Sequence, residues 1–303
     1  MGVCLLLNLT FMNQKGGIMI CRNYKEGEKL KVADLNEIVV LIDRSETALT
    51  EVGLNTWRAN LTGPVHIHDQ KEQIFFVTSG TGTIIVGSGK YEVEPQELVY
   101  VPASVKHQTI ARAEEPLEYI LFNAFLAPDK EGHASFADHI AKVKDIRRAQ
   151  AQQTASSAED DTPIASKKGK HICNMYGGQR FDFGSNATVL LLDRIESERC
   201  EVTLVTWPPG NKGPIVAHKE KEQTFFVLSG TGWITVANET MAVKPGDIVF
   251  VPHSTPHTTK ADNEELSYLC LNTIVTEQCD ESSTKMFERV AQTRRARWEK
   301  GNE

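Results

Sequence analysis

Three histidines and one glutamate in the first half of the sequence have the residue types and spacing of a metal site. His66 and His68 lie two residues apart, Glu72 follows them, and His107 comes after a proline-marked segment. Side chains alternate along a strand, so the even-numbered His66, His68 and Glu72 are expected on one side. Imidazole and carboxylate ligands without thiolates suit divalent Fe, Mn, Co, Ni, Cu or Zn better than a closed structural zinc site. We predict one such metal, bound by His66, His68, Glu72 and His107.

A second copy of this stretch lies 150 residues further along the chain. His218, Glu222 and His257 repeat the pattern, but Val216 stands in the place of His66. Two histidines and one carboxylate form a facial triad, which leaves three coordination positions open. The alternative is that the second site has decayed. We predict a second metal at His218, Glu222 and His257, and we expect Glu72 or Glu222 to act as the catalytic base.

The repeat also determines the expected domain organisation. Trp57 matches Trp207 and Gly80 matches Gly230 at the same separation, a period that indicates two copies of one domain and not a solenoid. Short apolar segments separated by Gly and Pro predict an all-β barrel or jelly roll in each copy, followed by a short helix. The expected organisation is a disordered or non-native extension (1–18), a first domain (19–150), a flexible linker (151–170) and a second domain (171–303).

The two motifs resemble those of the cupin superfamily, and the duplication makes the chain similar to a metal-dependent bicupin of the small-molecule type. The first motif is His-x-His, three or four residues, Glu and a later glycine, which His66, His68, Glu72 and Gly80 match. The second is Pro-x-Gly followed by a histidine and often an asparagine. It is found at Pro95, His107 and Asn123, and again at Pro245, Gly246, His257 and Asn272; Gln96 replaces the glycine of the first copy. The resemblance implies two tandem cupin β-barrels. It also implies association through outer sheet faces, either as a homodimer or between the two copies within one chain.

Three functions remain open at this point. The favoured one is an oxidoreductase, a dioxygenase that binds a small oxygenated organic substrate at the His/Glu metal centre. The first alternative is a metal-dependent isomerase or lyase acting on a sugar or keto acid, and the second is a non-catalytic bicupin that binds a small ligand. Few lysines or arginines have inward parity on the strands, which disfavours a strongly anionic substrate.

The alternation of side chains also predicts how the neighbours of the two glutamates point. Gln73 and Gln223 are expected on the barrel exterior, and Phe76 and Phe226 inside with the glutamates. Three further groups are expected at the surface, in contact with solvent: Lys71 and Lys221, His139, and the arginines of the two helices.

Composition excludes several classes of partner. The formal net charge of −7, with no long basic run, argues against a nucleic-acid partner. No segment reaches the roughly 18 apolar residues of a membrane helix. The six cysteines form no CxxC pair, so free thiols in a reducing cytoplasm are expected.

Overall fold

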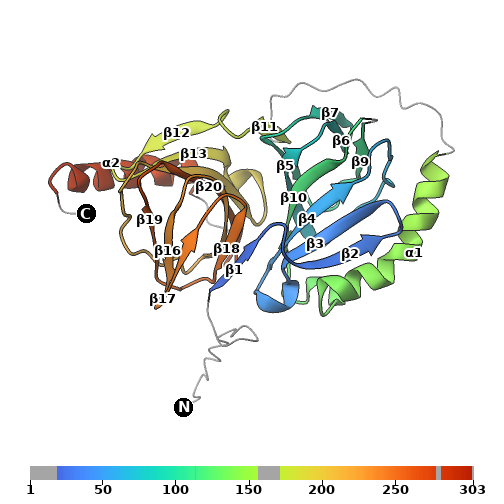
Figure 1. The fold of residues 1–303 in the computed structure, drawn as a ribbon, viewed down its shortest axis with the longest axis horizontal. Helices are drawn as coiled ribbons and strands as arrows, with labels where there is room; N and C mark the ends of the chain where they lie inside the picture. The colour runs from blue at the N-terminus through green and yellow to red at the C-terminus, as the bar shows by residue number, and fades with distance from the viewer. Residues whose placement is uncertain (1–18, 113, 156–170, 278–280, 302–303) are drawn as a thin grey trace, which may run out of the picture.

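The computed structural model describes residues 19–112, 114–155, 171–277 and 281–301, with only the backbone described for 151–155. The expected extension at residues 1–18 and most of the expected linker lie outside the described residues. Within them, the chain forms two similar units that lie side by side, each made of two antiparallel sheets, as the repeat predicts (Figure 1). The all-β, jelly-roll prediction is therefore confirmed.

The first unit places a seven-stranded sheet against a three-stranded one. The larger sheet has the strand order β11-β8-β5-β10-β4-β3-β2 and the smaller has the order β7-β6-β9. The strands are β2 (Glu28–Val32), β3 (Asn36–Ile42), β4 (Thr50–Trp57), β5 (Lys71–Ser79), β6 (Gly82–Val86), β7 (Gly89–Val93), β8 (Glu97–Val101), β9 (His107–Ala111), β10 (Leu117–Phe125) and β11 (Ile172–Asn174).

The second unit repeats this arrangement. Its larger sheet has the order β1-β18-β15-β20-β14-β13-β12 and its smaller sheet β17-β16-β19. The strands are β1 (Ile20–Asn23), β12 (Gln179–Asp182), β13 (Ala187–Leu192), β14 (Cys200–Trp207), β15 (Lys221–Ser229), β16 (Gly232–Val236), β17 (Glu239–Val243), β18 (Asp247–Val251), β19 (His257–Ala261) and β20 (Leu266–Ile274).

Gly80 and Gly230 show why both copies need glycine after the long central strand. Both have a left-handed backbone, with φ of +74° and +75°. A Cβ at either position would collide with a backbone carbonyl oxygen, that of Pro116 or Glu265. Only glycine satisfies both requirements, so each copy turns into its smaller sheet at the same place.

The two repeats exchange their first strands. Strand β1 pairs with β18 of the second unit, and β11 pairs with β8 of the first unit. Arg22 of β1 donates hydrogen bonds of 2.7 and 2.6 Å to the carboxylate of Glu46 in the first unit, which ties the exchanged strand back to its own repeat. Domain boundaries taken from sequence order alone do not anticipate this exchange.

The outer faces of the two large sheets share one core. Ile74 and Phe76 of β5 belong to the same buried cluster as Phe226 of β15 and Leu271 of β20. Phe75 instead packs inside the first unit. The placement of Phe76 and Phe226 inside the barrels was therefore wrong, and the contact between outer faces is made within one chain.

Each unit is followed by a helix that covers part of it (Figure 1). Helix α1 (Phe136–Ala155) packs Phe136 and Ile140 into the core of the first unit. Helix α2 (Ser283–Trp298) packs Phe287 and Val290 against a small cluster in the second. Neither helix, as far as the chain is described, combines the length and apolar character needed to cross a membrane.

Candidate metal centre

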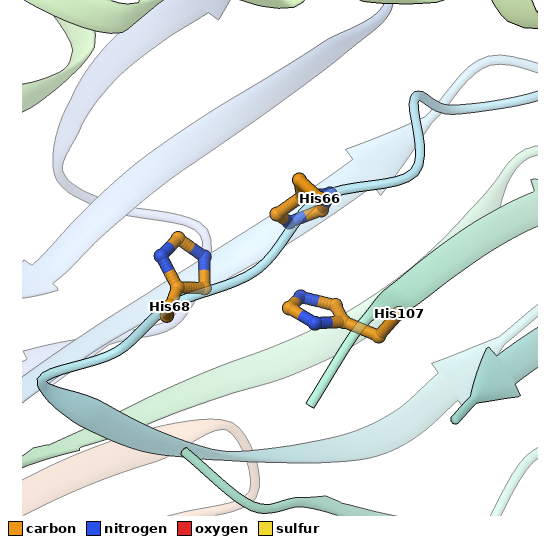
Figure 2. Close-up of side chains that lie close together, drawn as sticks. All are labelled: His66, His68 and His107. Carbon is orange, nitrogen blue, oxygen red and sulfur yellow. The ribbon is translucent and has the colours of Figure 1, made fainter. Parts of the chain in front are cut away.

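Three histidines converge inside the first unit. His66 and His68 lie on the segment that leads into β5, and His107 is the first residue of β9; their rings face one another (Figure 2). One ring nitrogen of each lies within 4.8 Å of the others. Backbone hydrogen bonds of 3.1 and 2.9 Å between His66 and His107 hold the two segments together. The predicted histidine cluster is thus present as a geometric group.

Hydrogen bonds determine which ring nitrogen carries the proton. Nδ1 of His66 lies 2.9 Å from the carbonyl oxygen of Pro64, and Nδ1 of His107 lies 3.2 Å from that of Val105. A carbonyl oxygen only accepts, so each Nδ1 donates and each Nε2 keeps its lone pair. The Nε2 atom of His107 is buried without a hydrogen-bond partner among the described residues. These rings are therefore oriented as ligands for a cation.

Burial keeps the three imidazoles neutral. It lowers the pKa of His66 and of His68 well below the usual value and that of His107 to about 4. Repulsion from the neighbouring positive groups adds to the effect for His66 and His68. A neutral imidazole is the form that binds a metal. The donor set consequently fits a divalent transition metal at neutral pH.

Gln73 brings a buried amide to the cavity. It lines the same cavity as the three histidines, and its Nε2 donates a 2.9 Å hydrogen bond to Oδ1 of Asn123. Its Oε1 is buried without a partner in the described part of the chain. Asn123 donates to Glu51 at 2.7 Å, and Glu51 is paired with Arg44, so a buried network fixes the amide. The prediction that Gln73 points to the exterior was wrong.

Glu72 and Glu222 lie elsewhere, which corrects the expectation that they point into the barrels. The Glu72 carboxylate accepts hydrogen bonds from the backbone N–H groups of Glu198 (2.9 Å) and Arg199 (2.7 Å) in the second unit. Glu222 accepts from the N–H groups of Ala48 (2.8 Å) and Leu49 (3.0 Å) in the first. Neither residue lines a histidine cavity.

The physical reason is a bend in the chain. Residues 69–70 form a bend between His68 and the start of β5 at Lys71. Alternation of side chains holds along one continuous strand, so parity counted from the histidines does not carry across this bend. Lys71, Gln73 and Phe75 of β5 line the cavity. Ile74 and Phe76 face the other unit.

A carboxylate from a loop supports His68. Oε1 of Glu131 lies 3.6 Å from Nδ1 of His68, and its Oε2 accepts a 2.8 Å hydrogen bond from Nζ of Lys71. Burial alone would raise the pKa of Glu131, but Lys71, with smaller contributions from His139 and Arg44, brings about a net lowering of the pKa. Glu131 has φ of 63° and Lys130 has φ of 49°. Two consecutive non-glycine residues in this region are costly, which is typical of functional sites.

Two cationic groups also line this cavity, against the expectation from strand parity. Lys71 is 2% exposed and not solvated, and Arg147 reaches the cavity from helix α1. His139, expected at the surface, is 8% exposed and lines the cavity as well. Helical spacing places Arg147 on the same face as Val143, a signal that was present in the sequence but interpreted as a solvated face.

The second unit keeps the backbone of this site and two of its three histidines. Val216 and His257 are joined by backbone hydrogen bonds of 3.0 and 2.8 Å, as their counterparts are. The rings of His218 and His257 lie 5.5 Å apart, and Nδ1 of His218 lies 3.5 Å from Glu220. In the described part of the chain, His66, His68 and His107 form the one group of three His, Cys, Asp or Glu ligands. The cavity here measures about 220 Å³, against about 80 Å³ in the first unit.

Comparison with known proteins agrees with this duplication. Residues 57–123 and 203–272 each match the cupin domain family. A stretch of 64 residues is 36% identical to an uncharacterized protein of Methanocaldococcus jannaschii; it covers 21% of this chain and 51% of that protein, about half of its length. The chain therefore carries two cupin domains.

Solved structures with a similar fold include two oxalate decarboxylases. A variant of the Bacillus subtilis enzyme has a TM-score of 0.60 and 13% identity, over 87% of this chain and 78% of that one. A formate complex of the Lactobacillus farciminis enzyme has a TM-score of 0.61 and 12% identity, over 86% of this chain and 87% of that one. At such low identity these likenesses establish the bicupin fold.

Proposed function

We propose that the first unit is a metal-dependent lyase site for a small carboxylate substrate, with the metal held by His66, His68, His107 and Gln73. The observation that carries the proposal is the presence of Arg147 and Lys71 in the same cavity as three neutral imidazoles. A guanidinium binds a carboxylate through paired hydrogen bonds, so Arg147 would orient the substrate against the ligand cluster.

The charge of the ligand set favours an anionic substrate. Three neutral imidazoles and one amide oxygen leave the full charge of a divalent ion in place, whereas a glutamate ligand would offset part of it. A metal bound here would supply Lewis-acid polarisation of a substrate oxygen. Lys71, held by Glu131 at 2.8 Å, is a proton-bearing group in the cavity wall that can neutralise developing negative charge.

The shape of the cavity favours a small substrate beside the histidines. The inner part measures about 80 Å³, and an outer hollow of about 410 Å³ shares His66, His68 and Arg147 with it. A short carboxylate fits the inner part. Oxalate is one member of this class, and the fold-level likeness to oxalate decarboxylases supports including it among the first compounds tested.

The experiment is a decarboxylation assay with parallel measurement of oxygen uptake. Apoprotein reloaded separately with Mn(II), Fe(II), Co(II), Ni(II) or Zn(II) is given oxalate, malonate, pyruvate and oxaloacetate. We expect CO₂ release without stoichiometric consumption of O₂. Oxygen uptake equal to substrate loss would instead support the dioxygenase interpretation, and absence of turnover with every metal would support a binding protein.

Arg147→Met tests the assignment of the substrate-binding cation. Loss of the paired hydrogen bonds to the carboxylate should raise KM or lower kcat/KM by roughly 10- to 100-fold. Arg148→Met is the matched control, because Arg148 is adjacent on α1 but exposed and paired with Asp145. Equal effects of the two substitutions would contradict the assignment.

A further inference from the structure

The second cavity has a different chemical character from the first. Its volume of about 220 Å³ exceeds the 150 Å³ or so that accommodates a benzene ring. We propose that it binds a small neutral aromatic molecule with a hydroxyl group, of the size of phenol, and that it holds no metal. This site is separate from the lyase site of the first unit and does not depend on it.

The residues that would hold a metal are missing here or engaged elsewhere. Val216 stands where the first unit has His66, so an apolar side chain replaces one imidazole. The carboxylate of Glu222 accepts three hydrogen bonds from the other unit, from Ala48, Leu49 and the hydroxyl of Thr50. His218, whose side chain is 31% exposed, is directed to Glu220 at the cavity edge. The second cavity therefore has two histidines and one amide oxygen, one imidazole fewer than the first, and it is available for an organic molecule.

The cavity wall offers apolar contacts to an aromatic ring. Apolar side chains that line it come from β14, β15, α2 and the segment before β15: Val205, Phe225, Phe287, Val290 and Val216. Burial of apolar surface contributes about 25 cal/mol per Å². A ring enclosed on several sides is therefore bound favourably without any charge.

Two acceptor atoms in the cavity require a hydrogen-bond donor from the ligand. Gln223 is 7% exposed, and its Nε2 donates a 2.9 Å hydrogen bond to Asn272. Its Oε1 is buried and has no partner among the described residues. Nδ1 of His257 donates to the carbonyl of Thr255 at 3.0 Å, so its Nε2 is an acceptor too. A hydroxyl group satisfies such an acceptor, whereas a hydrocarbon leaves it unpaired.

The charges around the cavity favour a neutral donor over an ammonium group. Glu201 is buried and already neutralised by Lys221 and Arg194, each at 2.7 Å. Arg294 lies in the wall, stacked over the ring of Phe183 at 5.3 Å. An ammonium ion would meet these cations without a free buried carboxylate. A phenolic hydroxyl donates the required hydrogen bond and adds no positive charge.

Phenol and toluene form a matched pair of probes, because a methyl group of similar size in toluene takes the place of the hydroxyl group in phenol. Their affinities for the full chain are measured by calorimetry or by ligand-observed NMR, on wild type and on Gln223→Leu. Removal of the acceptor should lower the preference for phenol over toluene by about five- to tenfold. Gln73→Leu, the equivalent change in the first unit, should leave that preference unchanged.

A second variant covers the case in which Gln223→Leu fails to fold. Val216→Phe fills the cavity without touching the buried network, so it should abolish binding of both probes while metal content stays unchanged. The proposal is overturned if phenol does not bind to wild type or if its preference survives in Gln223→Leu. It is also overturned if Gln73→Leu has the same effect, if Val216→Phe still binds the probes, or if wild type carries a metal that is lost on His257→Ala.

Discussion

The two cavities share a framework and differ in the few residues that face the ligand. Gln73, Asn123, Glu51 and Arg44 form a buried hydrogen-bonded chain in the first unit. Gln223, Asn272, Glu201 and Arg194 form the same chain in the second. The framework thus positions an amide oxygen in each cavity. Whether that oxygen meets a cation or a hydroxyl group depends on the residues around it, His66 or Val216 first among them.

The lysines show the same division between framework and site. Lys71 is paired with Glu131, which reaches His68 from a loop, whereas Lys221 is paired with Glu201 inside the network. The segment between β10 and α1 thus places a carboxylate beside a histidine of the first unit.

The largest expected effect comes from exchanging the residues that distinguish the two cavities. His66→Val should abolish metal binding in the first unit and lower turnover by at least about 100-fold, because two histidines and an amide remain. Val216→His should create a second cluster of three histidines on the existing backbone. Metal analysis should then give a content that rises from one to two equivalents per chain; no gain would show that backbone register alone does not determine the site.

The next effect separates stability from metal binding. Glu72→Gln should lower the free energy of unfolding by about 2–4 kcal/mol, because a buried carboxylate that accepts two backbone N–H bonds is replaced by an amide. Glu222→Gln should lower the free energy of unfolding by a similar amount, because Glu222 makes the reciprocal contact with the first unit. Chemical denaturation measures the loss, and metal content should stay unchanged. If Glu72→Gln folded stably but had lost its metal, the assignment of Glu72 as a metal ligand would be correct after all.

A smaller effect is expected from the carboxylate that supports His68. Glu131→Gln should weaken metal binding by about 10- to 100-fold, as is typical when a carboxylate partner of a ligating histidine is lost. Competition with a chromogenic chelator measures the affinity of the folded protein. Glu220→Gln is the matched change in the second unit and should leave it unaltered. Equal metal affinities in wild type and Glu131→Gln would show that Glu131 does not contribute to metal binding.

The smallest effect concerns pH. Burial lowers the pKa of His139 to about 2, whereas in the unfolded chain it is near 6.5. The unfolded state therefore binds a proton below about pH 6.5 that the folded state does not, so stability falls as the pH falls. Between pH 6.5 and 5 the loss from this residue is roughly 2 kcal/mol. His139→Gln should make the pH dependence of unfolding of the apoprotein shallower; an unchanged slope would contradict the burial of a neutral ring.

The sequence was sufficient for the features that repeat or alternate within one element. The 150-residue repeat predicted two β units, and the spacing of His66 and His68 placed both rings on one side, where His107 meets them. The sequence was insufficient where a bend interrupts a strand or where a distant segment of the chain contributes a residue. The bend at residues 69–70 reversed the parity of Glu72 and Gln73, so Gln73 lines the cavity and Glu72 contacts the other unit.

Other features depend on contacts between segments far apart in the chain. The exchange of β1 and β11 between units pairs segments that lie far apart in the sequence, which local patterns do not reveal. Arg147 and Glu131 reach the cavity through the packing of α1 and the loop before it, which spacing along the strands does not reveal. These tertiary contacts explain why a strongly anionic substrate was disfavoured from sequence.

Metal content per chain tests the central claim most directly, that the first unit holds the metal and the second does not. It is measured by mass spectrometry of the elements on wild type, His107→Ala and His257→Ala, purified without added metal. The account predicts one equivalent in wild type and in His257→Ala, and none in His107→Ala. Two equivalents in wild type, with one lost in each variant, would contradict it. The second unit, with Val216 in place of a histidine, would then hold a metal with open coordination positions.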